Sequence, residues 1–458
     1  MRSSTLLNCA LSLIVLVASS TAVHAAPFTN RGPGGMGTTD GTSSLRMWYK
    51  SDTSIFSNAA GTIPATNTGP VRNWDNLATT SNTGTNSLVD PTRQPTYLTG
   101  QADFNGRPVL DFTGGAQNTG GLLDLGSYTF SGDETAFFAL DFDQSAHRGI
   151  IAHQGVNRGW DGGDGSMFES SGFTFANNYF VNGFDTSTTG TSPLVVTGTD
   201  NPFAGAVSPL LMGSGHGGNA DYGGRLAETV IFNTTLNAAQ QSIVENYLSS
   251  GYNIGVGGAD KALFAGDHYN GDTLAKGNFD FDVFGVGKTT GANEQLNGGS
   301  LGFGIQVPSL NDNEWALAGH ASGSNGITTA DMGSNFGNSA ARWERSWHVD
   351  VDLPTAGTDI ITADIAFDWQ DALNTSTFDP RFNTLYFRPI NGGLFQVLAT
   401  GIVDIANQRV DFPGVTLTDG FYYTLGSVPV PEPSTLALLG LGTVGLTVKA
   451  RRRRRAAA

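Results

Sequence analysis

Cysteine is almost missing from this chain: the only one among 458 residues is Cys9. A disulfide framework and a cysteine-based zinc site are therefore both excluded. Charged residues are also scarce, at 14% against about 25% in an average protein. Seven of the 24 basic residues lie in the first and last 25 residues, which leaves 17 bases against 40 acids between 26 and 433, a net charge of −23. Because such a surface repels phosphates, we expect no nucleic-acid partner.

The usual catalytic signatures are also lacking. Once a signal sequence containing Cys9 is removed, no thiol nucleophile remains, and the chain has no G-x-S-x-G elbow and no paired histidines of the H-E-x-x-H type. The E-x-D-x-x-E string of concanavalin-like glucanases is absent too. We therefore predict no catalytic residues, no cofactor and a protein that is not an enzyme.

The N-terminus has the pattern of a secretory signal peptide. Arg2 supplies the positive charge, an apolar stretch follows over residues 6–18, and small residues precede a cleavage site after Ala25. An uncleaved anchor helix is the alternative, although the apolar run is short for a membrane span. Signal peptidase is thus an expected partner.

The C-terminus combines a proline-rich triplet, a short apolar segment and a basic cluster. Pro431, Glu432 and Pro433 form the triplet, residues 436–448 are apolar, and the basic stop is formed by Arg451, Arg452, Arg453, Arg454 and Arg455. Thirteen residues make a helix of about 20 Å, which only marginally crosses a hydrocarbon layer of about 30 Å. The arginines should stay on the cytoplasmic side.

This tail resembles the PEP-CTERM sorting signal of Gram-negative bacteria, and the match covers residues 429–455. The resemblance implies processing near Pro431, Glu432 and Pro433 by a membrane protease of the exosortase type. It also implies a body that is exported to the cell envelope, cell surface or extracellular matrix and held only transiently in the inner membrane. An ordinary C-terminal anchor is the alternative.

Between its ends the chain reads as an all-β protein with one helix. Alternating apolar runs at residues 135–142, 149–153, 226–232, 360–369 and 384–387 are separated by turn residues, which predicts short strands in a sandwich or jelly roll. The spacing places Leu226, Glu228 and Val230 on one strand face, where Glu228 would be a buried, hydrogen-bonded carboxylate with a raised pKa. A helix is predicted over 237–250, with Asn237 and Gln240 as a capping box and Gly251 as its end.

Residues 45–255 resemble a LamG-like, concanavalin-A-like jelly roll. The opening strand is LRMWYKSD (45–52), followed by VRNWDNLA (71–78), QPTY (94–97) and NGRPVLDF (105–112). The closing element matches at Gly224, Leu226, Ala227, Glu228, Ile231, Phe232, Asn233, Tyr247, Leu248, Tyr252 and Ile254. The resemblance implies a two-sheet sandwich and contact with carbohydrate or a protein ligand, without implying catalysis.

The remaining boundaries follow from composition. Residues 1–25 are the signal peptide, 26–44 a linker, 45–255 the jelly roll, 261–428 a second β-rich domain of unknown role and 429–455 the sorting signal. Glycines at 255, 257 and 258 suggest a hinge between the domains. In the second domain, the phrases FDFDVFGVGK (279–288), WALAGH (315–320) and RWERSWHVDVD (342–352) resemble a β-rich domain found after such jelly rolls.

The candidate binding residues are few. Trp160, beside Asp161 in a predicted polar loop, is the candidate for a sugar-stacking platform, with a loop anchor as the alternative. Asp161, Asp164, Ser166 and Glu169 could hold calcium, or the aspartates could stabilise a glycine-rich turn. The pairs Asp141/Asp143 and Asp280/Asp282 are expected on solvent-facing sides of strands, and Trp74 and Trp347 in the core.

Together these features predict an exported, non-catalytic surface or matrix protein that binds a glycan or another ligand, such as an extracellular polysaccharide, through its jelly roll. Two alternatives stay open: a secreted polysaccharide-active enzyme with an unrecognised site, and a purely structural coat protein.

Overall fold

The computed structural model describes most of the chain between residues 31 and 427. The described ranges are 31–78, 93–112, 120–143, 148–153, 158–162, 168–170, 173–174, 179–182, 184–185, 192–199, 204–214, 222–257, 266–321, 326–333, 340–354, 359–370, 379, 381–389 and 392–427. The predicted signal peptide and sorting tail lie outside these ranges. Short apolar-alternating segments between turn residues pair as antiparallel strands throughout.

Two sheets pack face to face in the N-terminal half, here called the first sandwich. Its larger sheet has the order β14 (Phe184–Asp185), β13 (Tyr179–Val181), β15 (Leu194–Gly198), β8 (Thr135–Leu140), β18 (Arg225–Phe232), β5 (Arg107–Asp111) and β4 (Thr96–Gln101), with β1 (Leu45–Lys50) also paired to β18. Its smaller sheet has the order β12 (Phe173–Thr174), β11 (Phe168–Ser170), β10 (Arg158–Gly162), β9 (Arg148–His153), β17 (Leu211–Met212) and β6 (Leu123–Asp124).

Apolar side chains from both sheets fill the space between them. Phe138 and Val196 of the larger sheet join Ile151 and Met212 of the smaller sheet in one buried cluster. Two ribbons and a short helical turn complete this half: β2 (Ile55–Phe56) with β3 (Asn73–Trp74), β7 (Tyr128–Ser131) with β16 (Ala204–Val207), and η1 (Ala102–Phe104). The two-layer arrangement agrees with the all-β prediction, and the jelly-roll assignment stays a prediction.

The C-terminal half forms a second sandwich. Its larger sheet has the order β20 (Glu294–Gln295), β19 (Phe281–Lys288), β23 (Glu314–His320), β26 (Trp347–Asp352), β32 (Phe421–Gly426), β25 (Arg342–Trp343) and β24 (Ile327–Thr328), with β28 (Thr384–Arg388) joining β32 to β29 (Gln396–Thr400). The facing sheet has the order β21 (Asn297–Ser300), β22 (Phe303–Gln306), β27 (Ile360–Asp368), β31 (Arg409–Thr418) and β30 (Ile402–Asp404). Trp347 and Phe367 meet in the core between these sheets.

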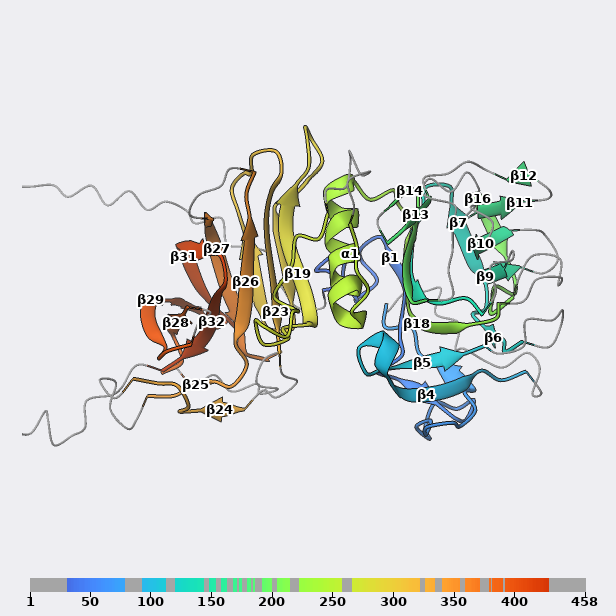
Figure 1. Cartoon of the computed structure of the whole chain (residues 1–458), viewed down its shortest axis with the longest axis horizontal. Helices are drawn as coiled ribbons and strands as arrows, with labels where there is room; N and C mark the ends of the chain where they lie inside the picture. Colours follow the sequence, from blue (N-terminus) through green and yellow to red (C-terminus); the bar gives the residue numbers. More distant parts are fainter. Residues whose placement is uncertain are drawn as a thin grey trace, which may run out of the picture.

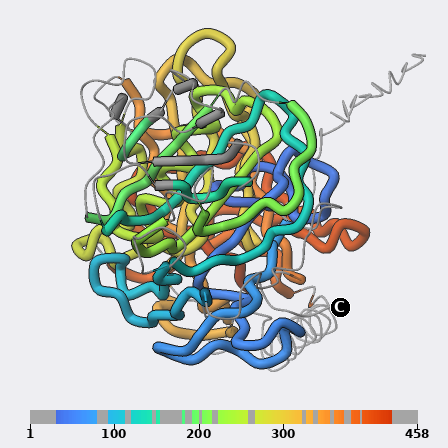
Figure 2. The backbone as a smooth tube through the Cα atoms, turned by 90° about the vertical axis from the view of Figure 1, so that its right-hand side faces the viewer, coloured from blue at the N-terminus to red at the C-terminus, as the bar shows by residue number. Residues whose placement is uncertain are grey.

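The helix α1 (Ala238–Tyr252) lies between the two sandwiches, so the molecule is a stack of five layers (Figure 1). Phe137 and Val230 of the first sandwich, Ile243 and Leu248 of α1, and Leu317 of the second sandwich belong to one buried cluster, the interlayer core. In the end-on view of Figure 2 the first sandwich is in front of the second. The halves therefore share a core across the predicted boundary at 255–258.

The start of α1 agrees with the prediction, but its end does not. Asn237 is the N-cap, and Asn237 and Gln240 form the capping box expected from the sequence. Gly251 lies inside the helix, which ends at Asn253 in the left-handed conformation, with φ of 53°. An asparagine tolerates that conformation, so the helix ends two residues beyond Gly251, where the sequence predicted its end.

The helix α1 is buried on more than one face. Because sheets cover it on two sides, polar side chains on α1 are buried as well and need partners. Thr197 donates to Glu245 at 2.7 Å, Gln241 donates to the carbonyl of Leu236 at 2.6 Å, and the backbone N–H of His268 donates to Asn246 at 2.9 Å. The first bond ties α1 to β15 of the first sandwich, and the third ties it to the segment that precedes β19.

The predicted strands are observed with end shifts of a few residues. β8, β9, β18, β27 and β28 match the five predicted runs. β19 and β26 fall within two of the phrases quoted from the second half, and β23 covers the third and begins one residue before it. Trp74 and Trp347 are both fully buried, as predicted.

Candidate functional site

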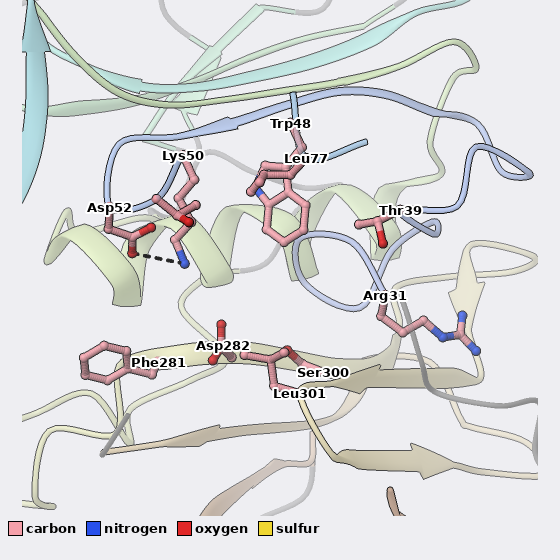
Figure 3. Close-up of a pocket in the computed structure, with 11 residues that line it drawn as sticks. Arg31, Thr39, Trp48, Lys50, Asp52, Leu77, Phe281, Asp282, Ser300 and Leu301 are labelled. Atoms are coloured by element: carbon pink, nitrogen blue, oxygen red, sulfur yellow. Dashed lines mark ion pairs between the residues drawn. The ribbon is translucent and has the colours of Figure 1, made fainter. Parts of the chain in front are cut away.

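A pocket of about 570 Å³ opens between the two sandwiches beside α1, and we call it the interlayer pocket (Figure 3). The first sandwich and its leading segment provide one wall, and β19 with the turn after β21 provides the other. The pocket is lined by Arg31, Thr39, Trp48, Lys50, Asp52, Thr53, Leu77, Phe281, Asp282, Ser300 and Leu301. Its size lies within the range of small-ligand sites.

Trp48 in the upper wall is held from behind by a buried carboxylate. Its indole Nε1 donates to Glu228 Oε1 at 2.6 Å, and Glu228 is only 1% exposed. The hydroxyls of Tyr247 and Tyr252 donate to the two oxygens of Glu228, each at 2.8 Å. We call these four side chains the Glu228 nest. Trp48 of β1, Glu228 of β18 and the two tyrosines of α1 thus meet at one point. Their hydrogen bonds fix the orientation of the indole.

A β-bulge places Glu228 in this position. The pairing of β18 with β8 shifts register between Leu226 and Glu228. As a result Leu226 joins the core of the first sandwich, whereas Val230 joins the interlayer core on the side of α1. The prediction that Leu226 and Glu228 share a face is therefore wrong, because the extra residue reverses the alternation. The prediction of a buried, hydrogen-bonded Glu228 is confirmed.

Burial is also what raises the pKa of Glu228, as the sequence suggested. Lys50 and the three donors of the nest lower it, but they offset only part of that effect. Both carboxylate oxygens face donors inside the protein, so neither is directed into the interlayer pocket. Glu228 is therefore placed to hold Trp48 and not to exchange a proton with a ligand.

A second bulge aims Asp282 at the pocket from the opposite wall. The pairing of β19 with β23 shifts register between Phe281 and Phe284, and Asp282 takes a positive φ of 51°. Its Oδ2 lies 2.8 Å from Nε2 of the buried His320. Burial opposes ionisation, but the bond from His320 and the charge of Lys50 outweigh it and hold the pKa of Asp282 below its usual range. Asp282 is therefore an ionised acceptor in the pocket wall.

Lys50 extends between the two walls (Figure 3). Its Nζ lies 3.4 Å from Asp52 Oδ2, which is an ion pair longer than a charge-assisted hydrogen bond. Burial disfavours its charge, but Asp52, Asp282 and Glu228 together raise the pKa of Lys50. Lys50 therefore stays charged, with capacity left to donate to a ligand oxygen.

Behind the pocket, the β4–β5 hairpin clamps the two sandwiches together. Arg107 Nε donates to the carbonyl of Gly251 at 2.9 Å, its Nη2 donates to the carbonyl of Asp280 at 3.3 Å, and its guanidinium lies 4.2 Å from the centre of the Phe281 ring. Asn105 donates to the side chain of Asp280 at 2.5 Å. These contacts place β19, and with it Asp282, relative to β1.

The expectation that the paired aspartates face solvent is wrong for two of them. Asp141 is 5% exposed and accepts hydrogen bonds from the backbone N–H of Arg225 at 2.7 Å and from its Nε at 2.8 Å. Asp280 is also 5% exposed. Each carboxylate has a cationic partner far away in the sequence, and that partner is why it can be buried.

Trp160 does not lie in a loop. It belongs to β10, where it pairs with Ile151 of β9 and Phe168 of β11. Its side chain, and residues 163–167 with Asp164 and Ser166 of the suggested calcium loop, lie outside the described part of the structure. Among the residues that are described, no group of three or more His, Cys, Asp or Glu side chains is arranged to hold a metal ion.

Sequence reasoning did not find the pocket residues Trp48, Lys50, Asp52 and Asp282 as a set. Trp48 and Lys50 stand in the opening strand LRMWYKSD, and Asp282 was seen only as half of a strand pair. A signal did exist in the Glu228 strand, because a buried glutamate in an apolar run needs donors. The register that joins segments some 230 residues apart could not be read locally.

Comparison with known proteins identifies the C-terminal tail. The model of the PEP-CTERM protein-sorting motif matches residues 429–454. The motif indicates a protein that is exported and sorted to the cell surface through processing by an exosortase, as predicted from Pro431, Glu432 and Pro433. A search of curated proteins found no match to the chain. Within the described ranges, no helix is long and apolar enough to cross a membrane.

Proposed function

We propose that this protein is a non-catalytic surface protein that binds a saccharide in the interlayer pocket. The observation that carries the proposal is Trp48, an aromatic ring held rigidly by the Glu228 nest in the wall of a pocket of about 570 Å³. A fixed indole offers a flat apolar face at little entropic cost on binding. Lys50, Asp52, Asp282 and Ser300 surround it with hydrogen-bonding groups suited to hydroxyls.

A saccharide ligand also agrees with the export of the protein. The sorting motif directs the body of the protein to the cell surface, where saccharides are abundant ligands. The resemblance of residues 45–255 to concanavalin-A-like domains points to the same ligand class. Our proposal differs from the one based on sequence in placing the ligand against Trp48, between the two sandwiches, and not at Trp160.

The carboxylates of the pocket favour binding over catalysis. A general acid for glycoside cleavage needs a raised pKa and a proton within reach of the substrate. Glu228 has the raised pKa but faces the nest, and Asp282 faces the pocket but has a lowered pKa. The alternative of a polysaccharide-active enzyme is tested directly by measuring whether reducing ends are released from any glycan that binds.

The test is a glycan array with the mature protein, followed by calorimetric titration of the best ligand. We expect Trp48→Ala to weaken binding by about tenfold or more, as truncation of a central aromatic anchor does. Trp160→Ala is the matched control and should bind like the wild type. Loss of binding in Trp160→Ala with retention in Trp48→Ala would place the site in the first sandwich alone and overturn the proposal.

A further inference from the structure

The two ends of the interlayer pocket differ in charge. At one end Lys50 lies among Asp52, Asp282 and Glu228, so its positive charge is already compensated. At the other end is Arg31, with Thr39 beside it (Figure 3). Within the described part of the chain, no carboxylate lies within ion-pair distance of Arg31.

Arg31 is also incompletely hydrogen-bonded. Its Nε is buried and has no hydrogen-bond partner among the residues that the structure describes, although the side chain as a whole is half-buried and lines the pocket. Burial lowers the pKa of Arg31, because the charged guanidinium has lost part of its water. A guanidinium in this state gains most from a planar, bidentate anion.

The segment that carries Arg31 is fixed in place. Gly34 pairs with Phe284 of β19, and a Cβ added to Gly35 would lie 2.9 Å from the backbone N of Gly299. Both glycines have positive φ, of 65° and 79°, so the chain passes closely between α1 and the second sandwich. Arg31 is thus presented from a tightly packed turn.

From these observations we propose that the interlayer pocket recognises an acidic saccharide, with the carboxylate of a uronic acid residue at Arg31 and the neutral hydroxyls at the Lys50–Asp52 end. This inference rests on the proposed saccharide site. The pocket suits a ligand with one anionic group, bound at Arg31. Asp52 and Asp282 at the opposite end would repel a second anionic group. The ring of the sugar would lie against Trp48, between the two polar ends.

The experiment compares acidic trisaccharides with their own methyl esters. Trimers of glucuronate, galacturonate and mannuronate, each with its fully methyl-esterified form, are titrated into the mature full chain by calorimetry. We expect at least one acid to bind about 10- to 100-fold more tightly than its ester, which is the scale of a charge-assisted hydrogen bond. Raising the salt from about 0.05 to about 0.5 M should weaken binding of the acid more than of the ester.

Substitution then assigns the difference to one side chain. Arg31→Gln should bring the ratio of the affinities for acid and ester to about one, and Arg31→Lys should keep part of the preference for the acid. Trp48→Ala should weaken both ligands, and thermal unfolding verifies that each variant is folded.

Each result has a definite consequence. Esters that bind as tightly as acids would overturn the role of Arg31 and leave the saccharide site standing. An acid preference that survives in Arg31→Gln would place the carboxylate elsewhere. Absence of binding by every member of the panel, with neutral glycans still bound on the array, would overturn the acidic specificity alone. No binding to any glycan would overturn both proposals.

Discussion

Two buried polar side chains in the interlayer core are accommodated in opposite ways. Glu228 receives three hydrogen bonds, from Trp48, Tyr247 and Tyr252. His348 on β26 is fully buried, and neither ring nitrogen has a hydrogen-bond partner among the described residues. It is surrounded instead by the rings of Tyr269, Phe279 and Tyr422, with centroids 5.5–6.0 Å away, which we call the His348 cage.

The comparison shows two kinds of buried polar side chain: Glu228, which positions a residue of the pocket, and His348, which the core accommodates without using its polar atoms. A carboxylate with three donors orders the side chains that donate to it, and here it orders the indole that lines the pocket. A neutral imidazole in an aromatic cage contributes packing and orders nothing by hydrogen bonding. Removing the first should therefore damage both stability and binding, whereas removing the second should change only how stability depends on pH.

The largest expected effect is that of Glu228→Leu. It would leave the Tyr247 hydroxyl and the indole N–H without their acceptor, and the Tyr252 hydroxyl with only the carbonyl of Ala227 at 3.4 Å. Lys50 would also lose one of its neighbouring carboxylates. Loss of one partner of a buried charge costs about 3–5 kcal/mol. We expect the free energy of unfolding, measured by urea denaturation, to fall by about that amount.

Glu228→Gln is the matched control, because it keeps the shape and one acceptor oxygen. It should lose less stability than Glu228→Leu and retain saccharide binding in part. If both variants were as stable as the wild type, the contrast between the Glu228 nest and the His348 cage would not hold.

His348→Leu should change the acid side of the stability profile. Burial first, with the charge of Lys276, lowers the pKa of His348 to about 4, so the imidazole stays neutral in the fold while the unfolded chain binds a proton below about pH 6.5. The unfolded state then holds more protons, and the wild type loses stability as the pH falls from 6.5 to 4. The loss attributable to His348 is about 3 kcal/mol, and it should be missing in the variant.

The neighbouring Asp350 acts in the other direction and is present in both proteins. Burial raises its pKa to about 8, so its contribution to stability decreases as the pH rises from about 4 to 8. Subtracting the wild-type profile from that of His348→Leu removes this contribution. Near pH 7 the two proteins should differ by less than about 1 kcal/mol, since an imidazole without hydrogen bonds is replaced by an apolar group. Parallel profiles down to pH 4 would contradict the assignment.

Sequence reasoning succeeded where the determining contacts are local. The capping box of α1 spans four residues, and the alternation of β8 or β27 is visible in each run alone. It failed where a partner that is distant in the sequence determines whether a side chain is buried. Asp141 was expected in solvent because Arg225, 84 residues away, cannot be assigned to it by spacing.

The candidate site shows the same division. The burial of Glu228 could be predicted from the apolar residues around it, but the bulge that turns it toward Trp48 arises from pairing with β8. The pocket itself needs β1 and β19 on opposite sides of α1, an arrangement that no single segment encodes. Trp160 was expected in a loop because of the glycines and aspartates that follow it, although it pairs on both sides in β10.

Asn237 provides a case between the nest and the cage, and Asn237→Ala has the smallest expected effect. The side chain of Asn237 accepts from the backbone N–H of Gln240 at 3.0 Å and donates to the carbonyl of Glu294 at 3.1 Å, but it is only half-buried. Water can replace part of what is lost, so the cost should be about 1 kcal/mol, typical of an N-cap. Thermal or urea unfolding measures this change, with Asn237→Ser as the control that keeps the cap.

Because Asn237 and the tyrosines of the nest lie at opposite ends of α1, saccharide affinity should not change. An effect as large as that of Glu228→Leu would mean that position on the helix, and not burial of a satisfied polar group, determines the cost.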